Sequence, residues 1–173
     1  MRRKNAAVRV AYPAILGALA VIVVYLASLA PTGKWGIVAV AGLLPTAAVI
    51  SAGMKAGLLC WAGASILAFL LVPEKFCALL FTTLFGLYPM IKSAAEKPRK
   101  RLLEYAVKLA FFNGVFTVLY VTMMGTVLDT LPALLGESRW GLYLAANIVF
   151  VLYDYGFSRL IAVYLNRVQR TVH

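Results

Sequence analysis

Residues 8–30 read VRVAYPAILGALAVIVVYLASLA, an apolar run whose single charge, Arg9, stands near its start. A helix of about 20 apolar residues is long enough to cross the hydrocarbon core of a bilayer. The apolar residues are continuous here, whereas the surface helix of a soluble protein carries them as a stripe. The stretch therefore predicts a transmembrane helix.

Similar apolar runs recur along the rest of the chain, and 63% of the 173 residues are hydrophobic. A soluble domain is closer to half apolar. We predict an all-α integral membrane protein, a bundle of six transmembrane helices forming a single domain over residues 1–173. The expected spans lie at about residues 8–30, 35–51, 53–72, 76–91, 102–128 and 140–165.

The boundary between the second and third spans is the least marked of the six. Residues 53–57 read GMKAG, and Lys55 is the charge that interrupts an otherwise continuous apolar run. These residues predict a turn, and an alternative start for the third span lies nearer Leu58. If Lys55 instead extends its long side chain to the membrane surface, the number of spans drops.

The first run also resembles a secretory signal peptide, because Arg2, Arg3 and Lys4 precede it and small residues follow at 28–30. Two features favour a transmembrane helix that is not cleaved from the protein. The run is long enough to span a membrane, and Pro31 follows the apparent cleavage site directly.

Basic residues concentrate in every second gap between the apolar runs. One set of gaps holds 12 of them and the other set holds 3, namely Lys34, Lys75 and Arg139. Loops rich in lysine and arginine stay in the cytoplasm. The pattern predicts that both termini are cytoplasmic, in a multi-pass protein of a bacterial inner or cytoplasmic membrane.

Several functional classes are disfavoured by the composition. The net charge of +11 lies beside apolar runs, where lipid explains it better than nucleic acid does. Cys60 and Cys77 both fall inside apolar runs and are expected to be free thiols. The sequence lacks metal-ligand spacings and the common hydrolase and nucleotide-binding motifs. We predict no metal, no cofactor, no catalytic residues and no enzymatic activity.

Four ionisable or amide side chains stand out inside the fifth and sixth predicted spans, namely Lys108, Asn113, Asn147 and Asp154. Such residues are costly in a membrane and usually face a partner or a cavity. Asn113 and Asp154 are each eleven residues from the inner end of their span and are expected at similar depth, with Lys108 able to reach Asp154. The cluster either binds a substrate or joins the two helices, and the single acid favours the second interpretation.

Two further groups of residues suggest contacts with partners. Ala14 and Ala18 in the first span have the small-xxx-small spacing that lets another helix approach closely. A basic run follows the fourth span, where anionic lipid headgroups are the default ligand and a partner protein is the alternative. Its members are Lys92, Lys97, Arg99, Lys100 and Arg101.

The layout resembles the substrate-binding S components of energy-coupling factor transporters, and also related small six-helix membrane proteins of Gram-positive bacteria. The resemblance rests on six short helices, termini inside, and the alanine pattern of the first helix. It implies that Ala14 and Ala18 contact a transmembrane coupling subunit that works with ATPases, and that a vitamin or metal ion is captured from the outer side. The chain lacks the histidines and acids near its N-terminus that a metal-binding member would need.

The leading hypothesis is therefore an S-component-like subunit that binds a small molecule for uptake. A second hypothesis is a non-transporting scaffold or regulator that docks a partner or anionic lipid through the basic inner loop. A third is a small autonomous transporter that works as an oligomer.

Overall fold

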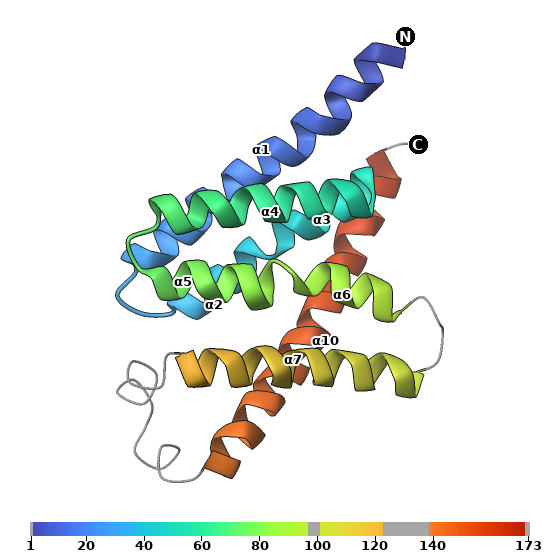
Figure 1. Cartoon of the computed structure of the whole chain (residues 1–173). Helices are drawn as coiled ribbons and strands as arrows, with labels where there is room; N and C mark the ends of the chain where they lie inside the picture. Colours follow the sequence, from blue (N-terminus) through green and yellow to red (C-terminus); the bar gives the residue numbers. More distant parts are fainter. Residues whose placement is uncertain (1, 97–100, 123–138, 172–173) are drawn as a thin grey trace. The chain divides into compact units, whose positions relative to one another are not determined.

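The computed structural model describes residues 2–96, 101–122 and 139–171, and every regular element in these ranges is helical (Figure 1). The elements are α1 (Arg2–Leu29), α2 (Lys34–Ala41), α3 (Leu43–Ala52), α4 (Met54–Leu71), α5 (Lys75–Leu80), the π-helix η1 (Phe81–Phe85), α6 (Tyr88–Ala95), α7 (Arg101–Thr122) and α10 (Arg139–Thr171). The predicted all-α fold class is confirmed for these residues.

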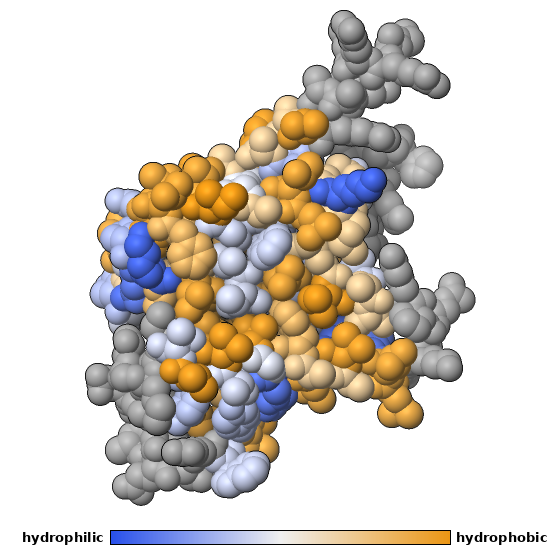
Figure 2. All heavy atoms as spheres, in the orientation of Figure 1, coloured by the Kyte–Doolittle hydropathy of each residue, from blue (hydrophilic) through white to orange (hydrophobic). Residues whose placement is uncertain are grey.

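Six helical segments are long and apolar enough to cross a membrane, in agreement with the six predicted runs. They are Val10–Leu29, Lys34–Ala52, Met54–Leu71, Lys75–Ala95, Leu102–Thr122 and Trp140–Ala162. Large apolar side chains such as Leu59, Leu70 and Val118 are exposed, and Figure 2 shows hydrophobic residues over much of the face in view. The end of the fifth predicted span, at residue 128, lies outside the described residues.

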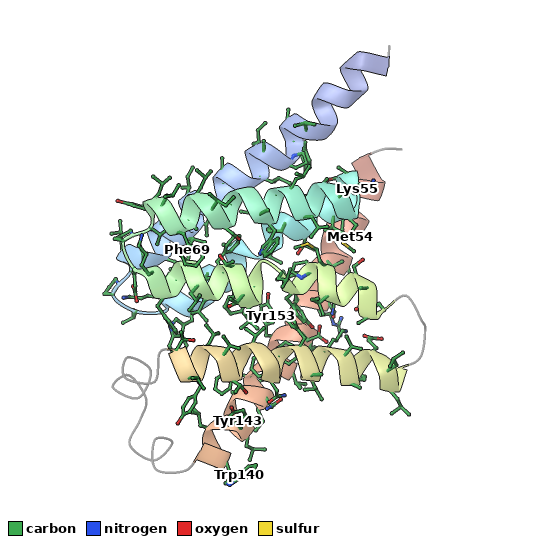
Figure 3. The ribbon with its side chains drawn as sticks, viewed as in Figure 1. Met54, Lys55, Phe69, Trp140, Tyr143 and Tyr153 are labelled. Carbon is green, nitrogen blue, oxygen red and sulfur yellow. The ribbon has the colours of Figure 1, made fainter. Side chains whose placement is uncertain are left out.

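The turn between the second and third membrane-length segments is tighter than the sequence suggested. Only Gly53 separates α3 from α4, and its positive φ of 89° is one that glycine adopts without steric cost. Helix α4 begins at Met54, so the alternative start near Leu58 is wrong. Lys55 is exposed in the first turn of α4, at the opposite end of that helix from Phe69 (Figure 3).

The chain divides into two compact units, residues 1–108 and 109–173. Helix α7 contributes its first residues to unit 1 and the rest to unit 2. The single domain predicted over residues 1–173 stays a prediction.

Unit 1 is assembled around α1, which contacts α4, α3 and α2. The buried positions of α1 repeat every three or four residues and include Gly17, Ala20 and Val24. A Cβ atom added to Gly17 would lie 3.3 Å from the carbonyl oxygen of Cys60 on α4. The buried residues of α4 are small as well. Small side chains let two helix backbones approach closely, as is common between helices in membranes.

Two glycines make room for the π-helix in unit 1. The Gly86 backbone N–H donates to the Phe81 oxygen at 2.6 Å, five residues back, which is the π-helical pattern. A Cβ atom on Gly86 would lie 2.8 Å from both that oxygen and Cδ1 of Trp61. A Cβ atom on Gly42, between α2 and α3, would lie 2.6 Å from the Phe85 oxygen. Side chains at these two positions would force the surrounding helices apart.

Unit 2 pairs the greater part of α7 with α10 through aromatic ring contacts and side-chain hydrogen bonds. The rings of Phe112 and Phe150 stack with centroids 4.3 Å apart, and Phe116 meets Tyr143 edge-on at 5.1 Å. Figure 3 labels Tyr143 near the start of α10. These offset and edge-to-face geometries are the favourable ones for aromatic pairs.

Candidate functional site

Two lysines of unit 1 are buried and share a carboxylate. Lys92 on α6 and Lys108 on α7 are 4% and 3% exposed. Oε1 of Glu96 lies 3.3 Å from Nζ of Lys92 and 3.2 Å from Nζ of Lys108. Oε1 of Glu104 is 2.5 Å from Nζ of Lys108. Glu96 therefore joins the end of α6 to the beginning of α7 through one oxygen atom.

Helical spacing positions the four charged groups. Lys92 and Glu96, and Glu104 and Lys108, are each four residues apart, so each pair lies on one helix face. The ammonium of Lys92 also lies 5.9 Å from the ring centroid of Tyr88, and that of Lys108 lies 5.9 Å from the ring of Tyr105. Aromatic faces attract ammonium groups and take the place of part of their water.

The four charges cancel within the cluster. Glu96 is 46% exposed at its side chain and Glu104 is 23% exposed, so both carboxylates reach the surface of unit 1 while the ammonium groups stay inside. Burial makes each ammonium depend on its carboxylates, because an isolated buried charge is strongly unfavourable. The ion pairs can hold α6 to α7. A change in the charge of Glu96 would remove a partner from both ammonium groups.

Sequence reasoning found part of this cluster. It identified Lys108, and it missed Glu96. The signal available was that Glu96 is four residues after Lys92 and lies beside the basic residues 97–101. Lys92 was expected among the lipid or partner contacts, and the structure instead buries it. The pairing of Lys108 with Asp154 stays a prediction.

The two asparagines of the predicted polar cluster bind each other in unit 2. Nδ2 of Asn113 donates to Oδ1 of Asn147 at 2.9 Å, and Nδ2 of Asn147 donates to Oδ1 of Asn113 at 3.0 Å. Each Nδ2 also donates to the carbonyl four residues earlier in its own helix, at 2.8 Å. Both protons of each amide are used, which is how a polar contact between helices is satisfied.

This pairing shows which residues of α7 and α10 meet. Asn113 lies beside Asn147, and Asp154 is seven residues further along α10, about 10 Å at 1.5 Å per residue. The expectation that Asn113 and Asp154 share a depth in the membrane stays a prediction. Asp154 is partly buried on α10, and its carbonyl accepts a bond from Oγ of Ser158 at 2.8 Å.

The chain matches no protein-family model, no curated protein and no solved structure. Its site is therefore interpreted from its own geometry.

The remaining predicted contacts lie on α1 and in the basic run. Ala14 and Ala18 are both exposed on α1. Lys97, Arg99 and Lys100 lie outside the described residues, and Arg101 begins α7.

The opposite end of unit 1 has an ion pair that sequence reasoning did not find. Nζ of Lys34, at the start of α2, lies 2.6 Å from Oε2 of Glu74, which precedes α5. Lys75 donates to the carbonyl oxygens of Phe69 and Val72 at 2.6 and 3.0 Å. A cation suits the C-terminal end of a helix such as α4, where carbonyl groups lack helical partners. The described residues include no group of histidine, cysteine and acidic side chains that could hold a metal ion.

Proposed function

We propose that the chain is a multi-pass subunit of a bacterial cytoplasmic membrane, with both termini inside, that binds a small molecule for uptake. In this proposal it resembles an S component and works with a transmembrane coupling subunit and ATPases. The observation that carries the proposal is the division of α1 into two faces. One face is packed inside unit 1, and the other, with Ala14 and Ala18, is exposed.

The exposed face is suited to a second helix because its side chains are small at these positions. Ala14 and Ala18 are four residues apart and lie nearly above one another on the helix surface. Large exposed side chains, including Ile15 and Ile22, occupy neighbouring positions on one side of the two alanines. A partner helix could approach the α1 backbone at the alanines, and close packing of small residues is one of the sources of helix association in lipid.

The alternative of a scaffold that docks lipid through its inner basic loop receives less support. Lys92, one of the five residues of that proposed surface, is buried and paired with Glu96. Its charge is then already balanced, and it is not positioned at the surface to meet a headgroup.

Replacing both Ala14 and Ala18 with tryptophan tests the docking surface. We expect recovery of the coupling subunit and ATPases with tagged protein from host membranes to fall at least about tenfold, because two indole rings would hold the partner helix away. Quantitative mass spectrometry of the purified complex measures this recovery.

Leu19→Trp is the matched control. Leu19 is also exposed on α1 but lies about 100° around the helix from Ala18. This variant should retain the partners, and the amount of protein in the membrane should be equal for both variants. If wild-type protein is recovered without any such subunits, the proposal fails.

A further inference from the structure

Two hydroxyl groups are buried in unit 1 without a hydrogen bond. Oγ of Ser65 on α4 and Oγ1 of Thr82 on η1 are enclosed, and neither has a hydrogen-bond partner among the residues that the structure describes. Ser65 as a whole is 6% exposed. Buried polar atoms are nearly always paired, and an unpaired one in a native protein indicates an additional water, ion or functional role.

Other threonine hydroxyl groups in the helices of unit 1 are paired in the ordinary way. Thr83 donates to the Leu79 oxygen at 2.7 Å, and Thr46 donates to the Gly42 oxygen at 3.0 Å, each four residues back. This bond is open to any serine or threonine in a helix. Thr82 is the direct neighbour of Thr83 and does not make it. Among the buried serine and threonine hydroxyl groups of the described residues, only those of Ser65 and Thr82 lack such a bond.

The two hydroxyl groups lie on adjacent helices and at similar distances from one end of unit 1. Helix α4 contacts both α5 and η1. Nε1 of Trp61, one turn before Ser65, donates to the backbone oxygen of Thr82 at 2.9 Å. Ser65 is six residues from the end of α4 at Leu71, and Thr82 is seven residues from the start of α5 at Lys75, so both lie about 10 Å from that end of unit 1.

The chemistry of this position favours a small cation. Inside a helix the backbone N–H groups are engaged, whereas each carbonyl oxygen keeps a second lone pair. The hydroxyl groups add two more oxygens, so the surroundings offer oxygen ligands. The π-helix also shifts its carbonyl groups from the α-helical pattern, and such interruptions are frequent at functional sites. In membrane transporters, irregular helical carbonyls coordinate Na⁺.

Size and charge limit the ligand further. Both hydroxyl oxygens are almost inaccessible, which leaves no opening for an organic molecule. No group of acidic, cysteine and histidine side chains that could hold a metal ion occurs in the described chain, and a divalent cation would need such charged ligands. We propose that Ser65 and Thr82 form part of a Na⁺ site between α4 and η1. This proposal does not depend on the partner docking at α1.

Thermal unfolding of the purified full-length protein tests the site. Melting temperatures are measured in NaCl, KCl and choline chloride at equal concentration, so that chloride and ionic strength stay constant. We expect Na⁺ to raise the melting temperature saturably, by about 5 °C at saturation, since a ligand that binds only the folded state stabilises it. Equal melting temperatures in the three salts would overturn the proposal and would leave a buried water as the occupant.

Variants assign the effect to the two hydroxyl groups. Ser65→Ala and Thr82→Val should each raise the Na⁺ concentration for half-maximal effect at least about tenfold, because each loses one oxygen ligand. Thr83→Val, whose hydroxyl is already bonded to Leu79, should respond as wild type does. Thr82→Ser keeps the hydroxyl and should also be stabilised by Na⁺. Binding of radioactive Na⁺ provides a second measurement that does not rely on unfolding. A Na⁺ response unchanged in Thr82→Val would contradict the site.

Discussion

Gly42→Ala is expected to destabilise unit 1 by about 3 kcal/mol, one of the largest effects of any single methyl group in the chain. The new Cβ atom would lie 2.6 Å from the Phe85 oxygen and 3.0 Å from its carbonyl carbon. These are backbone atoms of the π-helix, so the clash cannot be relieved by turning a side chain. Relief requires that α2 and α3 move away from η1. The free energy of unfolding in detergent measures the loss.

Gly63→Ala on α4 is the matched control for this prediction. Gly63 is exposed, and a Cβ atom there would meet nothing within 4 Å. Alanine in the middle of a helix is favoured over glycine by roughly 0.5–1 kcal/mol, so the control should equal or exceed wild type in stability. If Gly42→Ala were as stable as Gly63→Ala, the close packing of η1 against Gly42 would be wrong.

Lys108→Met is expected to cost about 3 kcal/mol of stability. The substitution keeps the apolar stem of the side chain and removes the ammonium that contacts Glu96 and Glu104. The two carboxylates then lose a positive neighbour in a partly buried position. Part of the loss should be recovered in the double variant Lys108→Met/Glu104→Gln, since one uncompensated negative charge is removed with it.

Lys55→Met tests whether the loss of any lysine charge would lower stability as much as Lys108→Met does. Lys55 is exposed in the first turn of α4, and its replacement should change stability by less than about 0.5 kcal/mol. Equal losses for the two lysine variants, or no recovery in the double variant, would contradict a specific role of the ion pairs at Lys108.

The positions of the helices could be predicted from the sequence because membrane spans depend on composition over about 20 residues. That signal is local and strong, and the six observed segments follow it. The turn at Gly53 could also be predicted, because one charge and two glycines interrupt the apolar run there.

The contacts between helices were not predictable in the same way. The choice of Asn147 as the partner of Asn113 depends on the register of α7 against α10, which the composition of each span does not determine. The shared role of Glu96 depends on how α6 meets α7. The π-helix packs against Gly42 and Trp61, residues that are distant from it in sequence. The apolar pattern of the sequence indicates which segments are helices, but it does not indicate which helix faces contact each other.

The proposed function depends first on how the chain lies in the membrane. Single cysteines at Thr32, between α1 and α2, and at Ser51, near the end of α3, mark opposite ends of the second membrane-length segment. Both positions are exposed, whereas the native Cys60 and Cys77 are buried and can be replaced by alanine.

Labelling of intact cells with a membrane-impermeant maleimide is the most direct measurement. The account predicts that Thr32→Cys is labelled from outside and that Ser51→Cys is labelled only after the membrane is permeabilised. Labelling of both positions in intact cells, or of Ser51→Cys alone, would contradict the proposed orientation and with it the proposed uptake function.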